Sequence, residues 1–207
     1  MSPRRGFPRQ RDLRRRPPRL TPRHTVLIVC EGRRTEPNYF EDMRKALHLK
    51  TTEVRVLKGK GTGGAEQLVR KAKRAKREED FDDVWCVFGC DQCANFDDAV
   101  GLCASKRDAV GAAASNPCVE LWFLLHFEYT SAPLSTREVQ RRLAAHIPGY
   151  DKSSTPVYSL LEDRQPAAIA NAERLRSYHS DAGNKETETP STRMHVLVQS
   201  LTRLTED

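Results

Sequence analysis

A buried strand that stops on a carboxylate is the feature of this chain that most constrains its fold. Residues 25–30 (TVLIVC) form a near-continuous apolar run, and Glu31 and Gly32 follow at once. A short apolar run bounded by a turn is typical of a parallel strand that is buried on both faces. In open α/β sheets, binding and catalytic groups gather at the carboxyl ends of such strands. Glu31 therefore lies where the chemistry of this fold class is expected.

The rest of the chain predicts an α/β fold, a parallel sheet flanked by helices, because strand and helix patterns alternate. Strands are expected over residues 25–30, 52–57, 83–88 and 110–114, and helices over 36–47, 65–79 and 95–107. Thr35 is a suitable N-cap for the first helix. From residue 117 onward the patterns are helical, over 118–129, 135–146, 165–179 and 192–205, with a polar loop at 180–191. This helical C-terminal portion is expected to pack on the sheet.

Three acids are candidates for chemistry at the carboxyl edge of the sheet. Glu36 follows Glu31 by five residues, and Asp91 follows the strand at 83–88. Carboxylates are ligands for Mg²⁺ and also act as general bases. For Glu36 the alternative is an acid that stabilises a helix N-terminus, and for Asp91 it is a turn residue. If the acids share a site, their carboxylates should lie within about 10 Å of each other, given metal–oxygen distances of about 2.0–2.6 Å and flexible side chains.

Two further features leave alternatives open. The glycine-rich segment 59–64, which contains Lys60, is not a P-loop, because Ala65 and Glu66 follow it in place of Lys and Ser or Thr. It is either a phosphate-binding turn at a helix N-terminus or a flexible connection. Glu120 lies in an apolar segment, where a buried acid needs a partner. It is either a structural ion-pair residue or a ligand.

Positive charge is concentrated at the N-terminus. Residues 1–24 contain nine arginines, one acid and five of the twelve prolines, a net charge of +8, so that residues 25–207 carry −1. Prolines disfavour a helix, and a disordered basic arm would neutralise phosphates without reading sequence. The alternative is a solubilising extension. We therefore expect a disordered tail over residues 1–24 and one folded domain over 24–205.

Composition also bounds the compartment. No apolar stretch approaches the roughly 20 residues of a membrane span, and the basic N-terminus lacks the hydrophobic segment of a secretory signal. The cytoplasm is therefore expected, and the six cysteines are expected to be reduced thiols. Cys90 and Cys93 could form a redox or zinc pair. Cys86 lies inside a strand, which argues against an iron–sulfur motif made with those two residues.

Three motifs in this order resemble the RloB-like family. They are VCEGRRTEPNYF at 29–40, VWCVF at 84–88 and SNPCVELWFLLHF at 115–127. The likeness continues through Tyr150-x-Lys152 to Thr192 and covers roughly residues 24–205. RloB-like proteins are similar to Toprim domains, the metal-dependent catalytic fold of topoisomerases, primases and certain nucleases. The resemblance implies a Toprim-like fold, and a role in prokaryotic phage defence through abortive infection or restriction, beside an ATPase partner.

The same resemblance implies a nuclease that depends on Mg²⁺ or Mn²⁺, with Glu31 as catalytic residue and metal ligand and Glu36 as second acid. The family usually has Asp-x-Asp after its second motif, but here Gly89 replaces the first aspartate and Asp91 remains. Losing a charged oxygen ligand predicts a weakly held metal, unless Glu120 compensates.

The alternative function is a catalytically inactive subunit that binds nucleic acid or a partner. Basic residues expected at nucleic acid are Arg14, Arg15, Arg16, Arg33, Arg34, Lys60 and Lys152.

Deleting residues 1–24 should lower the affinity for nucleic acid and flatten its salt dependence. Each phosphate contact that is lost reduces the slope of log K against log salt by about 0.7–0.9. Titration of the full chain and the shortened chain with one oligonucleotide at several salt concentrations measures both quantities. An unchanged slope would show that the tail makes no phosphate contacts.

Overall fold

The computed structural model describes residues 24–51, 53–59, 64–90, 95–105, 108–152 and 155–206. The arginine-rich tail, Lys60, Asp91 and Cys93 lie outside these described residues. Five strands form one sheet in the order β2-β1-β3-β4-β5. The strands are β1 (Val26–Cys30), β2 (Val54–Leu57), β3 (Asp83–Gly89), β4 (Gly111–Asn116) and β5 (Ser191–Thr192). The first four run parallel to one another, and β5 pairs antiparallel with β4.

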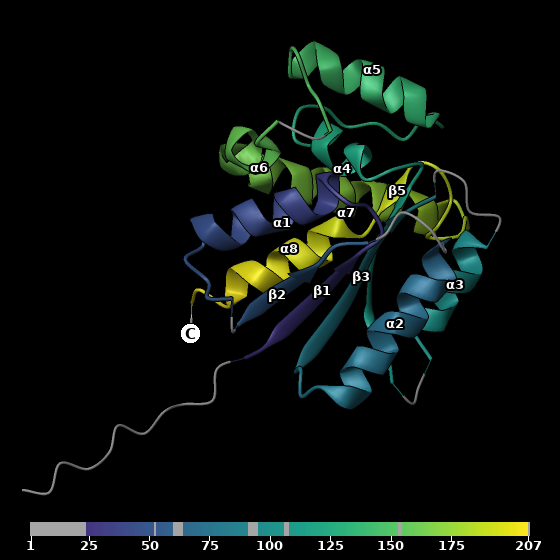
Figure 1. The fold of residues 1–207 in the computed structure, drawn as a ribbon. Helices are drawn as coiled ribbons and strands as arrows, with labels where there is room; N and C mark the ends of the chain where they lie inside the picture. The colour runs from purple at the N-terminus through teal and green to yellow at the C-terminus, as the bar shows by residue number, and fades with distance from the viewer. Residues whose placement is uncertain are drawn as a thin grey trace, which may run out of the picture.

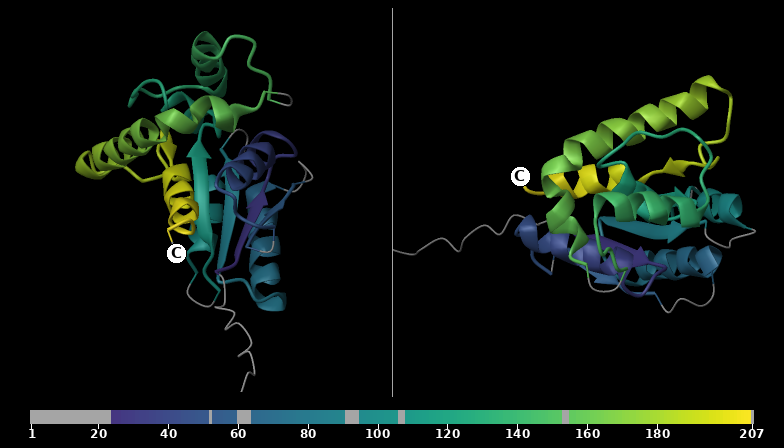
Figure 2. Two further views of the ribbon diagram at one scale, coloured as in Figure 1. Left: turned by 90° about the vertical axis from the view of Figure 1, so that its left-hand side faces the viewer. Right: turned by 90° about the horizontal axis from the view of Figure 1, so that it is seen from above.

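Helices cover both faces of the sheet (Figures 1 and 2). In chain order they are α1 (Thr35–Ala46), α2 (Gly64–Glu78), α3 (Phe96–Cys103), α4 (Glu120–Leu124), α5 (Thr136–His146), α6 (Val157–Leu161), the 3-10 turn η1 (Glu162–Arg164), α7 (Gln165–Asp181) and α8 (Met194–Arg203). Helices α2 and α3 pack on one face, and α1 and α8 pack on the other, while α4 to α7 gather beyond the carboxyl ends of the strands. The predicted α/β architecture with a helical C-terminal portion is confirmed.

The central strand β1 is buried on both faces, which explains its unbroken apolar sequence. All five of its residues are at most 1% exposed. Val26, Ile28 and Cys30 face the core under α1 and α8, whereas Leu27 and Val29 face the core under α2 and α3. A strand covered by helices on both sides has no solvent face on which to place polar residues.

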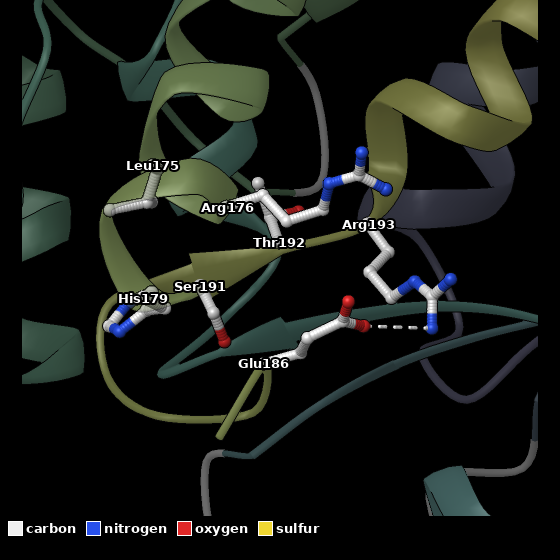
Figure 3. A pocket seen from close by; sticks show the side chains of 7 residues that line it. All are labelled: Leu175, Arg176, His179, Glu186, Ser191, Thr192 and Arg193. Atoms are coloured by element: carbon white, nitrogen blue, oxygen red, sulfur yellow. Dashed lines mark ion pairs between the residues drawn. The ribbon is translucent and has the colours of Figure 1, made fainter. Parts of the chain in front are cut away.

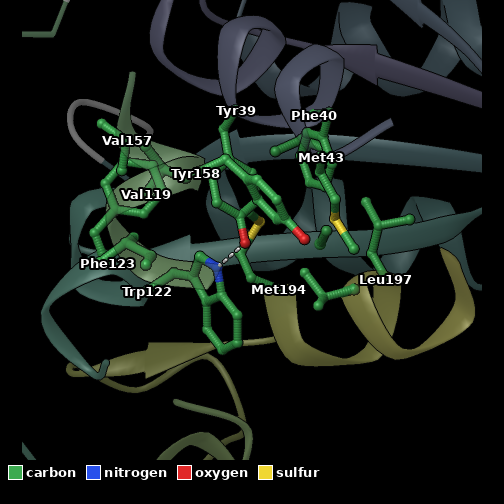
Figure 4. Close-up of a cluster of buried hydrophobic side chains, with 14 of the residues drawn as sticks. Tyr39, Phe40, Met43, Val119, Trp122, Phe123, Val157, Tyr158, Met194 and Leu197 are labelled. Carbon is green, nitrogen blue, oxygen red and sulfur yellow. Dashed lines mark hydrogen bonds between the residues drawn. The ribbon is translucent and has the colours of Figure 1, made fainter. Parts of the chain in front are cut away.

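An aromatic cluster joins α1 to the C-terminal helices (Figure 4). The Tyr39 hydroxyl accepts hydrogen bonds from Trp122 Nε1 at 2.9 Å and from Gln165 Nε2 at 2.9 Å. The Tyr39 ring also packs against Phe123 and Tyr158, with centroids 5.3 and 5.6 Å apart. The hydroxyl of Tyr39 thus links α1 by hydrogen bonds to α4 and to the start of α7, which are far from it in sequence. These bonds help to hold the helical C-terminal part against the rest of the fold.

Several predicted boundaries are wrong, for identifiable reasons. The buried segment 118–129 forms only the five-residue helix α4 followed by turns. Thr35 is the first residue of α1 and not its N-cap, and its hydroxyl donates to the carbonyl of Lys152 at 3.3 Å. The helix expected from residue 192 begins at Met194, because Ser191 and Thr192 pair with β4. A two-residue edge strand has no periodicity that a sequence could reveal.

None of the described helices is long and apolar enough to cross a membrane.

Tyr39→Phe should lower the free energy of unfolding by about 1–3 kcal/mol, because it leaves the N–H donors of the buried Trp122 and the partly buried Gln165 without their acceptor. Urea unfolding followed by circular dichroism measures the change. Tyr178→Phe is the matched control, because Tyr178 is 45% exposed. Equal losses in the two variants would show that the hydroxyl of Tyr39 contributes nothing specific.

Candidate functional site at the carboxyl edge of the sheet

Glu31 is held in place by the backbone ladder that continues past the end of β1. Its N–H donates to the Val87 carbonyl at 2.9 Å, so the pairing with β3 extends one residue beyond Cys30. Its side chain is partly buried, and Oε2 lies 3.4 Å from the backbone N of Gly89 at the end of β3. The sheet therefore fixes the Glu31 carboxylate between the ends of two neighbouring strands.

Glycines allow the backbone to pass close to both glutamates. A Cβ atom at Gly32 would lie 2.1 Å from Glu36 Oε2, so any larger residue would displace that carboxylate. A Cβ atom at Gly59 would lie 1.8 Å from the backbone O of Glu31, and Gly59 N–H donates to the Gly32 carbonyl at 3.1 Å. The first glycine of the glycine-rich segment is thus required for a close chain crossing.

Glu36 lies in the first turn of α1, and its pKa is raised to about 7. Burial is the largest cause, because it disfavours the charged carboxylate. The negative charges of Glu120 and Glu31 raise the pKa further, whereas the backbone hydrogen bond of Glu36 and the positive charge of Lys152 lower it. Glu31, which follows β1, and Glu120, the first residue of α4, therefore both act on Glu36 in the first turn of α1. All three lie at one edge of the sheet.

Glu120 opens α4 and is 1% exposed, so its charge needs a partner. Lys152 supplies it, with Nζ 2.8 Å from Glu120 Oε1. The Tyr150 hydroxyl is buried and has no hydrogen-bond partner among the described residues. Burial raises the pKa of Tyr150, and Glu120, Cys118 and Glu36 add to the effect. The segment around residue 150 thus lies close to Glu120 and Glu36.

The end of β3 is tied to the turn that precedes α4. Cys90 N–H lies 3.0 Å from the Ser115 carbonyl and 3.1 Å from the Pro117 carbonyl. Gly89 pairs with Ser115 in the sheet. The prediction that Asp91 converges with the glutamates falls on a residue outside the described part of the chain, and it stays a prediction.

The structure brings together some of the residues that the sequence singled out. Glu31, Glu36 and Glu120 interact, Arg33 and Arg34 lie exposed beside them, and Lys152 contacts Glu120. Among the described residues, however, no group of three or more His, Cys, Asp or Glu side chains is arranged to hold a metal ion. Arg14, Arg15, Arg16 and Lys60 lie outside these residues. Sequence reasoning missed Tyr150, for which the only signal was its place in the Tyr150-x-Lys152 motif.

Two hollows are candidates for ligand binding. An open one of about 430 Å³ borders α1 and the segment after β2, and it is lined by Asn38, Glu41, Asp42, Lys45, Lys58, Thr155 and Pro156. A second, of about 10 Å³, lies between α7 and β5 and is lined by Leu175, Arg176, His179, Glu186, Ser191, Thr192 and Arg193 (Figure 3). The second has room for about one water molecule, so the hollow beside α1 is the larger of the two candidates.

Glu36→Gln should reduce the pH dependence of stability. The folded pKa of about 7 exceeds the ordinary value of 4.5, so the folded protein keeps a proton that the unfolded chain has released. The free energy of unfolding therefore falls as the pH rises from about 4.5 to 7, and the full penalty is present above that range. Because Gln cannot ionise, the variant should exceed the native chain by about 1–3 kcal/mol at pH 8 and by much less at pH 4.5.

Urea unfolding at the two pH values measures this difference. Asp163→Asn, at an exposed residue in η1, is the control and should leave the pH dependence near that of the native chain. A Gln variant that is no more stable than the native chain at pH 8 would contradict the raised pKa of Glu36.

The comparisons with known proteins agree with the three sequence motifs. The family described as RloB-like protein matches residues 26–201, from the first strand to the last helix. Neither the curated proteins nor the solved structures gave a match. The matched region contains β1, the Glu31–Glu36 turn, the end of β3 and the Glu120 segment. This chain therefore belongs to the RloB-like family.

Proposed function

We propose that this chain is a metal-dependent nuclease that acts in prokaryotic phage defence. The observation that carries the proposal is that Glu31 and Glu120 both lie near enough to the buried Glu36 to raise its pKa, at the carboxyl edge of a mostly parallel sheet. Such edges are where α/β folds bind ligands. Burial is the largest cause of the raised pKa of Glu36, and the charges of Glu120 and Glu31 raise it further. Crowded carboxylates favour either proton uptake or a bound cation.

The chemistry of this donor set fits Mg²⁺ or Mn²⁺, which prefer carboxylate oxygens. Glu31 and Glu36 would hold the ion together with Asp91, and Glu120 is a further candidate that would have to release Lys152. When bound, the ion would polarise a phosphate and activate water for hydrolysis. The ion would be weakly held, because Gly89 offers no side-chain oxygen at the position where the family usually has aspartate.

The chain's own residues contribute positioning and proton transfer. With a pKa of about 7, Glu36 can hold or release a proton near neutral pH, as a general acid or base must. Glu31 is fixed between the two strand ends by its backbone bond to Val87. Arg33 and Arg34 are exposed next to the acids and suit phosphate oxygens. Lys152 keeps the buried charge of Glu120 neutralised.

The cellular role in this proposal rests on family resemblance. It includes nucleic acid as substrate, an ATPase partner protein and action in the cytoplasm. The arginine-rich residues 1–24 would add phosphate contacts that do not depend on sequence.

A second candidate function is a catalytically inactive subunit that binds nucleic acid or a partner. Two observations favour it. Gly89 stands where the family usually has an acid, and the described residues contain no group of three or more side chains arranged to hold a metal. The two functions differ in whether a divalent cation binds at the carboxyl edge and supports hydrolysis.

Gly89→Asp should raise the affinity for Mn²⁺ and increase metal-dependent cleavage of DNA or RNA. The new carboxylate would lie at the end of β3, next to Glu31, whose Oε2 is 3.4 Å from the backbone N of Gly89. Each charged oxygen ligand adds to divalent-cation affinity. Calorimetric titration with Mn²⁺ measures binding, and oligonucleotide cleavage with the ATPase partner present measures activity.

Adding Glu31→Ala should abolish the gain of Gly89→Asp, whereas an added Glu206→Ala at the exposed C-terminus should not. If the native chain already cleaves well and Gly89→Asp changes nothing, another acid such as Glu120 fills the role. Absence of cleavage and of Mn²⁺ binding in every variant would rule out the nuclease and leave the binding subunit.

A further inference from the structure

Helix α2 carries a basic face that the candidate site does not use. Arg70, Lys71, Arg74 and Arg77 are exposed and recur at helical spacing, and we call these four residues the α2 basic face. The opposite side of the helix is apolar and packs on the sheet through Ala65, Leu68, Val69 and Ala72. Residues three, four and seven apart share one side of a helix, so these cations form a continuous stripe toward solvent.

This charge stands out from the rest of the folded chain. The fifteen residues of α2 contain six Lys and Arg against two glutamates, a net charge of +4. The remainder of residues 25–207 carries a net charge of −5, so α2 is basic relative to the rest of the domain. Acids end the stripe at Glu78, Glu79 and Asp80. A basic stripe along one helix is the electrostatic footprint expected of a polyanion-binding face.

The position of α2 connects this stripe to the candidate site. The helix follows β2 and the Gly59 crossing, so it begins at the carboxyl edge of the sheet, where Glu31 lies. It then runs back along the sheet toward the start of β3 (Figures 1 and 2). Its fifteen residues span about 22 Å at about 1.5 Å per residue. A nucleic-acid strand lying on α2 would therefore have one end at the carboxyl edge of the sheet, the edge that carries Glu31.

Exposed ion pairs hold two of the three arginines of this stripe. Arg70 contacts Glu66 at 2.5 Å and Arg74 contacts Glu78 at 2.7 Å, and the side chains of both arginines are about 70% exposed (67% and 72%). Arg77 shares Asp108 with the inward-facing Lys73. Exposed ion pairs stabilise a fold little, and a guanidinium has five N–H donors, so each arginine can also bind phosphate. The glutamates orient the arginines without occupying all their donors.

We propose that the α2 basic face binds nucleic-acid phosphates and directs the strand to the carboxyl edge of the sheet. The inference deepens the proposed function, because it assumes that nucleic acid is the substrate of that site. Contacts would go to phosphates and not to bases, because the stripe consists of flexible cations on a convex helix. Binding along α2 would thus be strongly salt-dependent and tolerant of sequence.

The test measures binding of the full chain without metal, so that it is independent of cleavage. Arg70→Gln/Arg74→Gln should weaken binding of a labelled oligonucleotide about tenfold and reduce the salt slope by about 2. The matched control is Arg137→Gln/Arg141→Gln, which removes the same charge from exposed positions of α5. A third variant, Glu66→Gln/Glu78→Gln, frees both α2 arginines and should tighten binding. Circular dichroism confirms that the helices are intact.

Equal losses in the α2 and α5 variants, or no binding by the native chain, would overturn the proposal, since charge on α2 would then have no special role. Tighter binding by the glutamate variant together with a loss confined to the α2 arginines would support it. If the α2 arginines control binding but Mg²⁺ or Mn²⁺ gives no cleavage, the proposed nuclease activity is wrong, and the proposed binding face on α2 is supported. If the chain cleaves nucleic acid but the α2 arginine variant binds normally, the proposed nuclease activity is supported, and the proposed binding face on α2 is wrong.

Discussion

Parallel pairing of β1 with β3 is the constraint on which the candidate site depends. The register sets Cys30 opposite Val87, and the backbone bond from Glu31 to Val87 continues it. Both strands therefore end at the same edge, and the residues that follow them meet there. Shifting this register by one residue would turn the apolar side chains of β1 to the opposite faces and move Glu31 away from Gly89. The register of β1 against β3 thus sets both which side chains are buried in the core and where Glu31 lies.

Crowding of negative charge is the second feature of the site. Gly32 lets the Glu36 carboxylate lie against the backbone, and Glu120 is almost fully buried nearby. Burial, and after it the like charges of Glu120 and Glu31, raises the pKa of Glu36. The chain relieves this strain in two ways, through the ion pair between Lys152 and Glu120 and through the proton that Glu36 retains near neutral pH. The Lys152 ammonium and the proton on Glu36 both reduce the net negative charge around these carboxylates.

The sequence predicted the parts of the fold that follow from local pattern. The apolar run of β1 and the basic amphipathic helix α2 have strong periodicity, and both formed close to the expected bounds. The brief strand β5 and the short helix α6 could not be predicted, because tertiary pairing and packing create them. For the site, strand ends predicted the place of Glu31, and the spacing predicted that Glu36 lies near it. The Lys152–Glu120 pair joins residues 32 apart through the fold, so no local pattern could show it.

Proton uptake and metal binding would compete at this site under the proposed function. Metal ligation requires a deprotonated carboxylate, and Glu36 is about half protonated at neutral pH because its pKa is about 7. A divalent ion would have to displace that proton, and to recruit Glu120 it would also have to displace Lys152. Gly89 has no side-chain oxygen to offer a metal ion, and it also brings no further carboxylate to this edge. Under the proposed function, glycine at this position would weaken metal ligation, while it adds no negative charge beside Glu31.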